Sequence, residues 1–366
     1  MVDFLIELVK LETPSRSKEA QIPLFEMLQF RFKDLGYYCI HVDGNTSGGY
    51  LYARPTEKKS KAANQLLIGH SDTVWEKESL RDMPVTRLNG KTTGPGIYDM
   101  KAGLTQMYFA LKAIDELGLS MPALPLVLIN SDEEIGSAES TSVIRMLAKC
   151  SKRAFVLEPP LGLEGRLKTS RKGIGQFVIS VKGVAAHAGL DPGKGVNAIV
   201  ELSHQVQKLN AMNDFEKGVT VNVGMIEGGY SANVVAPESR AVVDVRVASI
   251  EDGHDISKKI RELEPVLEGI EIEVEGGIGR MPMEPTERNQ KLWHKARANG
   301  EFLGISLEQA MAGGGSDGNT TSLFTATLDG LGTVGDGAHA RHEFIFTDTI
   351  VERTALLAML LLDTLD

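Results

Sequence analysis

The chain has 366 residues, more than one hydrophobic core usually serves, so we expect two domains. Hydrophobic residues make up 42% of the sequence and charged residues 24%, which is typical of an ordinary soluble protein. Lys and Arg number 39 against 49 Asp and Glu, giving a net charge of −10. This balance argues against nucleic acid or an anionic membrane as the main partner.

The N-terminal segment MVDFLIELVKLETPS alternates charged with apolar residues and has no basic region. It predicts an amphipathic helix that ends near Thr13 rather than a signal peptide. No stretch approaches about 18 uninterrupted apolar residues, so we expect no membrane span and a cytoplasmic location. Cys39 and Cys150 have no metal-like spacing, which favours small apolar side chains over metal ligands.

Helical and strand patterns alternate through the first half of the chain. We expect helices at 17–35 and 102–117, and strands at 37–42, 49–54, 64–70, 124–130 and 153–158. The last two strands are apolar nearly throughout, as in strands that are buried in mixed or parallel sheets. The alternation predicts an α/β fold in which helices flank a mixed sheet.

The pattern changes near residue 172. We expect strands at 174–183, 220–229, 241–249 and 270–277, with helices at 196–210 and 251–264. Strand-helix-strand-strand-helix-strand is a ferredoxin-like α+β order, and it makes a self-contained domain of about 110 residues. We therefore expect a catalytic domain in two parts, 1–171 and 284–366, with a smaller domain inserted at 172–283.

Five segments carry side chains that zinc prefers, and each follows an apolar run that we interpret as a strand. They are GHSDT (His70, Asp72), GPGIYDMKAG (Asp99), NSDEEIGS (Glu133, Glu134), FVLEPP (Glu158) and DGAHARHE (His339). One such segment alone is more often a hydrogen-bonded loop or a solvated acidic turn. In open α/β sheets, however, binding sites form beyond the carboxyl ends of strands, and imidazole with carboxylate suits a divalent ion. Together the segments predict a metal-dependent hydrolase.

The order and wording of these segments resemble the di-zinc exopeptidase family of glutamate carboxypeptidase, aminoacylase, acetylornithine deacetylase and succinyl-diaminopimelate desuccinylase. The resemblance covers essentially the whole chain. It is closest to the glutamate carboxypeptidase branch, through AAHAG (His187), DVRV (Arg246) and GGGSDG (Ser316, Asp317). It implies a di-metal site at strand ends and an inserted domain that forms a homodimer.

The resemblance also implies a ligand set for two divalent ions, which we expect to be zinc, with cobalt or manganese as alternatives. The implied ligands are Asp99 as the bridge, His70 and Glu158 on one ion, and Glu134 and His339 on the other. His339 is preferred to His342 because the family pattern places a glutamate four residues after the ligand, where Glu343 stands.

Three further residues are predicted to act in catalysis. Asp72 lies two residues after His70, so in extended backbone it points to the same side and can orient the imidazole. Glu133 stands beside Glu134 without being a ligand, which makes it the expected general base. An acidic helix start is the alternative for this glutamate pair, and both interpretations can hold at once. The resemblance makes His187, in the inserted domain, the donor to the developing oxyanion, reaching the active site of the opposite subunit.

A substrate carboxylate needs its own polar partners. The candidates are Arg246, Arg280, Asn233, Arg166 and Ser316. Arginine forms bidentate pairs with carboxylates, so several arginines favour Glu or Asp as the released residue. The alternative for Arg246 is an ordinary ion pair with Asp244 on the same strand face.

These features predict hydrolysis of an amide bond that releases a C-terminal, acidic amino acid from a small peptide or an N-acyl amino acid. A deacylase of other specificity uses the same machinery and is the alternative. A non-catalytic relative is disfavoured because all five ligands and Glu133 are retained. An aminopeptidase is disfavoured because an acidic anchor for a substrate amine is not evident.

Overall fold

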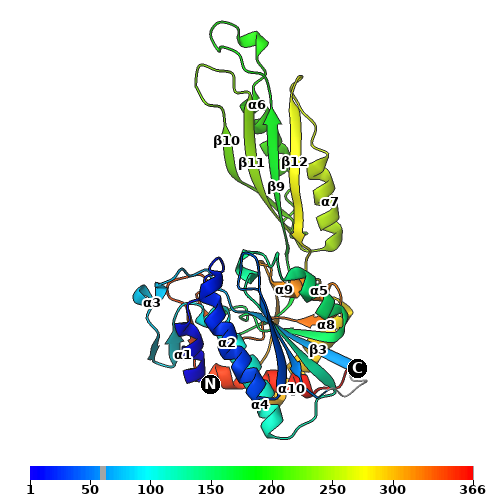
Figure 1. Ribbon diagram of the computed structural model, residues 1–366. Helices are drawn as coiled ribbons and strands as arrows, with labels where there is room; N and C mark the ends of the chain where they lie inside the picture. Colours follow the sequence, from blue (N-terminus) through cyan, green and yellow to red (C-terminus); the bar gives the residue numbers. More distant parts are fainter. Residues whose placement is uncertain (58–62, 366) are drawn as a thin grey trace. The chain divides into compact units, whose positions relative to one another are not determined.

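The computed structural model describes residues 1–57 and 63–365. The chain forms two compact units (Figure 1). The large unit comprises Met1–Ser170, Pro285–Ala312 and Ser316–Asp366, and the inserted unit comprises Arg171–Glu284 with Gly313–Gly315. The sequence placed Gly313–Gly315 with the large unit. They group with the inserted unit because Arg171 Nη1 donates to the carbonyls of Gly314 and Gly315, at 3.1 and 3.2 Å.

A six-stranded mixed sheet, in the order β1-β2-β6-β3-β7-β14, is the centre of the large unit. Its strands are β1 (Tyr37–Val42), β2 (Tyr50–Pro55), β3 (Ala63–His70), β6 (Ala123–Asn130), β7 (Ser151–Val156) and β14 (Ala326–Leu328). β3 lies parallel to both β6 and β7, so the carboxyl ends of these three strands meet at one edge. The register pairs His70 with Asn130 across that edge.

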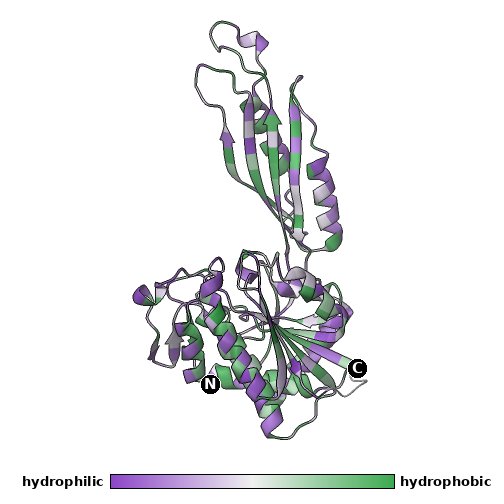
Figure 2. Ribbon diagram, viewed as in Figure 1, coloured by the Kyte–Doolittle hydropathy of each residue, from purple (hydrophilic) through white to green (hydrophobic). Residues whose placement is uncertain are grey.

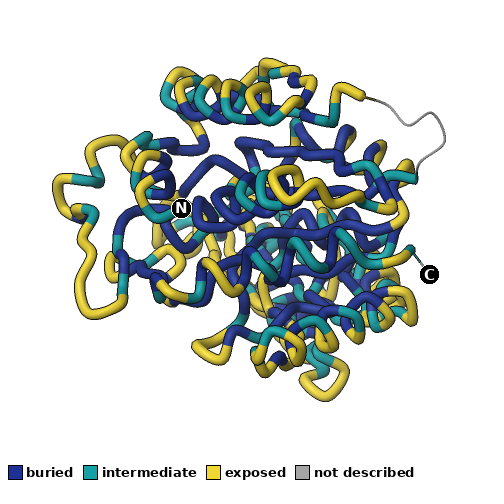
Figure 3. The backbone as a smooth tube through the Cα atoms, turned by 90° about the horizontal axis from the view of Figure 1, so that it is seen from below, coloured by how far each residue is buried: buried dark blue, intermediate teal, exposed yellow. Residues whose placement is uncertain are grey.

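Helices cover both faces of this sheet. The α-helices described in the large unit are α1 (Val2–Lys10), α2 (Lys18–Asp34), α3 (Ser79–Asp82), α4 (Ala102–Glu116), α5 (Thr141–Lys149), α8 (Glu287–Leu303), α9 (Asp317–Ser322) and α10 (Thr349–Leu362), of which α3 is a short surface turn. Successive strand residues point to opposite faces. Leu67 of β3 therefore joins the core that includes α2, α4 and α10, while Leu66 and Ile68 join the core that includes α5. Burial on both faces explains the apolar run Leu66–Ile68 in β3 and the nearly continuous apolar sequence of β6. Figure 3 shows buried segments in the interior and exposed segments mainly at the periphery.

Two small sheets connect distant parts of the large unit. The first contains β4 (Thr86–Leu88), β5 (Lys91–Thr93), β15 (Gly335–Asp336) and β16 (Phe344–Phe346), in the order β15-β16-β5-β4. The second pairs β8 (Leu167–Arg171) with β13 (Gln309–Ala312). Because β16 pairs with β5, the turn between β15 and β16 is anchored to the chain that leads into the Asp99 segment. His339 belongs to that turn.

The inserted unit has the order β9 (Gly173–Lys182), α6 (Ala198–Asn210), β10 (Thr220–Gly228), β11 (Glu238–Val247), α7 (Ile250–Arg261) and β12 (Glu271–Arg280). Its four strands form one antiparallel sheet, β10-β11-β9-β12. Buried and more exposed residues alternate along β9 and β11, because one face packs on the helices and the other faces solvent. Figure 2 shows the same alternation as bands of hydropathy along these strands.

The predicted α/β fold with an inserted ferredoxin-like domain is confirmed. β7 ends at Val156, two residues earlier than expected, so Glu158 lies in the loop that follows the strand rather than within it. Among the residues described, no helix combines the length and the apolar character that crossing a bilayer needs.

Candidate metal centre

One strand end and four connecting segments bring the predicted ligands to the carboxyl edge of β6, β3 and β7. His70 is the last residue of β3, Glu158 follows β7, and Glu134 lies in the short helical turn Glu133–Ile135 after β6. Asp99 lies in the segment that leads into α4, and His339 in the turn between β15 and β16. The first three positions follow from parallel strand pairing, because adjacent parallel strands end at the same edge.

The two imidazoles face opposite oxygens of the Asp99 carboxylate. His70 Nε2 lies 3.2 Å from Asp99 Oδ1, and His339 Nε2 lies 3.5 Å from Asp99 Oδ2. His70 Nε2 also lies 3.3 Å from Glu158 Oε1, and His339 Nε2 lies 3.0 Å from Glu134 Oε2. Asp99 thus stands between two groups, each made of one imidazole and one further carboxylate. All five side chains that the sequence proposed as ligands come together.

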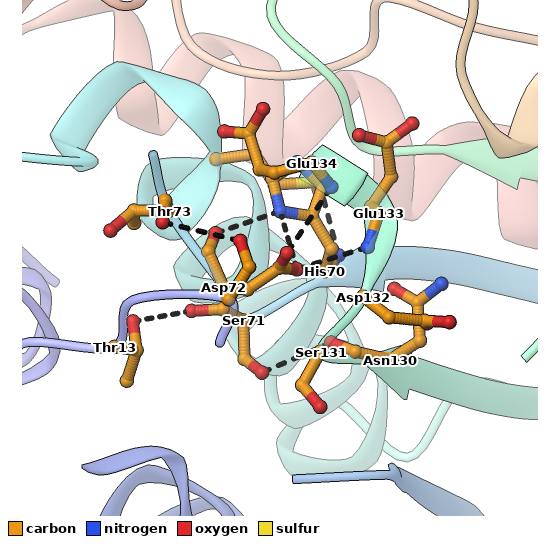
Figure 4. A network of polar contacts seen from close by, with 12 residues as sticks. Thr13, His70, Ser71, Asp72, Thr73, Asn130, Ser131, Asp132, Glu133 and Glu134 are labelled. Carbon is orange, nitrogen blue, oxygen red and sulfur yellow. Dashed lines mark hydrogen bonds and ion pairs between the residues drawn. The ribbon is translucent and has the colours of Figure 1, made fainter. Parts of the chain in front are cut away.

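Asp72 is fully buried and connects His70 with the acidic turn (Figure 4). His70 Nδ1 lies 3.0 Å from the Asp72 carbonyl oxygen and 3.4 Å from Asp72 Oδ1. The Asp72 carboxylate accepts hydrogen bonds from the backbone N–H groups of Glu133 and Glu134, each at 3.2 Å. Asp72 therefore holds the imidazole through its backbone carbonyl as well as its carboxylate, and it also orients the pair of glutamates.

The carboxylates of the cluster favour the positively charged forms of the two histidines. Burial opposes a charged His70, but hydrogen bonds with Asp72, Asp99 and Glu158 raise its pKa well above the ordinary value. Hydrogen bonds with Asp99 and Glu134 raise the pKa of His339 to about 10. Burial would raise the pKa of Asp99, but the two imidazoles lower it below the ordinary range. Such a set of buried carboxylates requires compensating cations.

The donor atoms fit divalent metal ions. Ligand atoms of His70, Asp99 and Glu134 lie within 4.8 Å of one another, and so do those of His70, Glu133 and Glu158. Within residues 1–57 and 63–365, Glu134 Oε1 is a buried oxygen without a hydrogen-bond partner. An orphaned carboxylate oxygen of this kind costs free energy unless a cation binds it. Nitrogen and oxygen donors without thiolate match zinc and similar ions.

A second layer of buried carboxylates supports the acidic turn. Asp132 accepts hydrogen bonds from Ser140 Oγ at 2.6 Å and from the backbone N–H of Glu139 at 2.8 Å. Asp317 accepts from Ser137 Oγ at 2.6 Å and from Asn130 Nδ2 at 2.7 Å. The sequence predicted this role for neither aspartate. The partners of Asp317 are 187 and 180 residues away in the chain, and only its place in the GGGSDG segment pointed to a function.

The two substrate-binding candidates of the large unit have local partners. Ser316 is fully buried, donates to Asp329 Oδ2 at 2.6 Å and accepts from the backbone N–H of Gly318, so it caps α9. Arg166 closes a turn with Leu161, and its guanidinium lies 3.8 Å from Glu164. These contacts explain both residues locally, and a role in substrate binding stays a prediction.

The other candidates belong to the inserted unit. His187 and Asn233 come from neighbouring segments, since His187 bridges with Val234 and the backbone N–H of Ala188 donates to the Asn233 carbonyl. Arg246 forms a two-point ion pair with Asp244, at 2.8 and 3.0 Å, which is the alternative that the sequence left open. Arg280 is the last residue of β12.

Comparisons with known proteins identify the family of the chain. Residues 169–264 match the peptidase dimerisation domain of the M20 peptidases. Carboxypeptidase G2 of Pseudomonas sp. (strain RS-16) is 29% identical over 99% of this chain and 89% of its own length. Succinyl-diaminopimelate desuccinylase of Dechloromonas aromatica is 25% identical over 90% of each chain.

The chain belongs to the M20 peptidase family.

Solved structures share the fold of this M20 peptidase. Aminopeptidase PepT of Bacillus cereus has a TM-score of 0.79 at 20% identity, with 98% of this chain and 96% of that chain covered. A dinuclear metal-binding peptidase of the M20 family from Bacillus subtilis has a TM-score of 0.74 at 13% identity, with 99% and 98% covered. Identities this low establish a shared architecture. The predicted membership of this exopeptidase family is confirmed, and the protein is a hydrolase of the carboxypeptidase and deacetylase type.

Proposed function

We propose that this M20 peptidase uses two divalent ions to hydrolyse an amide bond, and so releases a C-terminal amino acid from a small peptide or an N-acyl amino acid. The observation that carries the proposal is the Asp99 carboxylate, whose two oxygens face His70 and His339. Asp99 would bridge the ions, with His70 and Glu158 on one side and Glu134 and His339 on the other. Glu134 Oε1, which has no hydrogen-bond partner among the described residues, adds an oxygen that can bind an ion.

The bound ions would supply Lewis acidity to the substrate carbonyl and lower the pKa of water. Glu133 is then the general base. Its carboxylate lies within 4.8 Å of ligand atoms of His70 and Glu158, and Asp72 holds its backbone N–H. A proton taken from water by Glu133 is returned to the leaving amine, so the residue ends in the state in which it began.

His187 is proposed as the donor to the oxyanion that develops on the substrate carbonyl. The backbone N–H groups of Gly189 and Leu190 both donate to His187 Nδ1, at 3.1 Å. Since Nδ1 accepts, the neutral ring carries its proton on Nε2, and that N–H is the donor. The neighbouring Asn233 offers a second polar group to the same substrate.

Specificity for an acidic leaving residue is the finer part of the proposal. Arg246 and Arg280 are the cations assigned to the substrate carboxylates. Because Asp244 already satisfies Arg246, the pair must open, or share its guanidinium, when a substrate carboxylate binds. Because this pairing reduces the positive charge that Arg246 offers to an acidic substrate, it favours a second candidate function. That function is deacylation of N-acyl amino acids whose amino acid does not need to be acidic. The similarity to succinyl-diaminopimelate desuccinylase supports that candidate.

We propose further that the inserted unit forms a homodimer. Five large apolar side chains of α6, β10 and the following turn are exposed, namely Ile199, Val200, Met225, Ile226 and Tyr230. Tyr230 is 68% exposed and Ile226 57%. Exposed large apolar side chains that lie together in this way are typical of a protein–protein interface. The match to a peptidase dimerisation domain supports pairing of these faces in a twofold assembly, in which His187 serves the partner's active site.

One experiment tests the proposed function. Metal-stripped protein is assayed with zinc, cobalt or manganese on a substrate panel that varies the acyl group and the released amino acid separately. We expect activity only with metal, and the highest kcat/KM with Glu or Asp as the released residue. Full activity in the stripped protein would overturn the metal proposal, whereas a preference that follows the acyl group alone would select the deacylase.

A further inference from the structure

A buried glutamate organises the loop that carries Asp99. Glu343 is 1% exposed, and its carboxylate accepts four hydrogen bonds. Oε1 accepts from the backbone N–H groups of Tyr98 at 2.8 Å and Asp99 at 3.1 Å. Oε2 accepts from the backbone N–H of Gly96 and from Trp75 Nε1, both at 2.8 Å. One carboxylate therefore fixes three N–H groups within four successive residues, and one of these belongs to Asp99.

The same residue is fixed to the turn that carries His339. The backbone N–H of Glu343 donates to the Ala340 carbonyl at 3.0 Å, which closes the turn directly after His339. Glu343 immediately precedes β16, which pairs with β5 just before the Asp99 segment. Its backbone thus belongs to the turn with one imidazole, and its side chain holds the segment with the bridging carboxylate.

These contacts are specific. A buried carboxyl group is tolerated only when its oxygens have hydrogen-bond partners, and here each oxygen accepts from two donors. The Asp99 segment contains Gly94 and Gly96 at positive φ, a backbone conformation that side chains other than glycine rarely adopt. The Glu343 carboxylate adds three hydrogen bonds that help to hold this conformation.

We propose that Glu343 is a positioning residue of the metal centre, which keeps Asp99 between His70 and His339 and thereby sets the affinity for both ions. The inference rests on the proposed function, because it assumes that these side chains bind metal. Glu343 itself does not need to contact an ion. Residues that orient ligands in this way typically contribute 10–100-fold to metal affinity.

Glu343→Gln is the decisive variant because it preserves shape. Whichever way the amide is turned, its nitrogen faces two N–H donors, so two of the four hydrogen bonds are lost. Glu201→Gln is the matched control. Glu201 is also fully buried, and accepts from the backbone N–H groups of Val266 at 3.0 Å and Leu267 at 2.8 Å, but it belongs to the inserted unit.

The experiment is a calorimetric titration of metal-stripped, folded protein with zinc, with the fold checked by circular dichroism. We expect Glu343→Gln to weaken both binding events by about 10–100-fold. Glu201→Gln should lower the Tm but leave both affinities at the wild-type value. A residue with a merely structural role would lower the Tm without moving the affinities, so wild-type affinities in folded Glu343→Gln would overturn the proposal.

A milder variant keeps the inference testable if Glu343→Gln does not fold. Trp75→Phe removes one donor to Oε2 and leaves the three backbone hydrogen bonds in place. We expect it to weaken zinc binding measurably but less than Glu343→Gln does, by less than about tenfold. Unchanged affinity would overturn the proposal. If wild-type protein itself binds no zinc, the proposed function fails, an outcome distinct from equal binding by wild type and variants.

Discussion

The two units hold their candidate residues in different ways. In the large unit, His70 and Asp72 are almost fully buried, and hydrogen bonds within the unit fix their orientation. In the inserted unit, His187 and Asn233 are exposed, and Arg246 is satisfied by Asp244 within its own strand. The large unit thus carries a centre whose geometry its own fold specifies. The inserted unit carries residues whose proposed roles need a substrate or a second subunit.

Metal removal should have the largest effect on activity, because every proposed catalytic role in the large unit depends on the ions. Chelation followed by dialysis should reduce activity to background, and addition of zinc or cobalt should restore it. Elemental analysis should find close to two divalent ions per chain at saturation. Activity that survives chelation with no measurable metal would show that the cluster has another purpose.

The adjacent glutamates should separate into two classes. Glu133→Ala should lower kcat by about 10²–10⁴-fold while metal content stays at the wild-type level, because the general base is lost and the ligands are not. Glu134→Ala should instead weaken one metal site. Elemental analysis beside steady-state kinetics checks both. The reverse pattern would exchange the two assignments.

Arg246 tests whether the inserted unit recognises the substrate carboxylate. Arg246→Ala should cost about 2–5 kcal/mol in kcat/KM for substrates with a free C-terminus, because a desolvated carboxylate loses its partner. Asp244→Asn is the control, since it removes the competing partner and keeps the cation. An equal loss on an amidated substrate would mean that Arg246 only stabilises β11.

A mixing experiment tests whether His187 acts on the partner subunit. Glu133→Ala and His187→Ala homodimers should each be nearly inactive. After subunit exchange, each heterodimer has one site with both defects and one with neither, so an equal random mixture should regain at most about a quarter of wild-type activity. Verified exchange without recovery would place His187 in its own subunit or outside catalysis.

The smallest effect concerns the contact of Glu139 with the loop at Thr46 and Ser47, which holds no proposed ligand. Burial opposes ionisation of Glu139, but N–H and hydroxyl groups of Thr46 and Ser47 lower its pKa to about 2. A lowered folded-state pKa means that the stabilisation is present above the ordinary pKa and is lost as pH falls towards 2. Glu139→Gln should therefore flatten the acid limb of the Tm-versus-pH curve. An unchanged curve would show that this loop does not limit acid stability.

The position of each ligand relative to the strands explains which part of the centre could be predicted from the sequence. His70 ends β3, and Glu134 and Glu158 lie in the loops that follow β6 and β7, so parallel pairing brings these three positions together. Asp99 and His339 follow the short strands β5 and β15 of another sheet, so parallel pairing in the central sheet does not place them. Their approach depends on the pairing of β5 with β16, which joins segments about 250 residues apart by register.

The hydrogen bonds of Glu343 and Asp317 were beyond prediction for a related reason. Glu343 and Gly96 are 247 residues apart in the chain, and Asp317 and Asn130 are 187 apart. No local pattern records such a partner. Ser316 was similarly proposed for substrate because its glycine-rich setting suggests access, whereas Asp329 draws its hydroxyl into a helix cap. Arg246 was the opposite case, since Asp244 is only two residues away and the ion pair was foreseen as an alternative.

The interruption of the large unit has a consequence for how the protein is made. β14, β16 and α10 all follow the inserted unit in the chain, and so do His339 and Glu343. Domains generally fold as units during synthesis, so the inserted unit can fold while the large unit still lacks every element that follows Glu284, including β14, β16 and α10. A ribosome that has released Glu284 has exposed the Asp99 segment without the carboxylate that restrains it. The capacity to bind the proposed ions is therefore among the last properties that the growing polypeptide acquires.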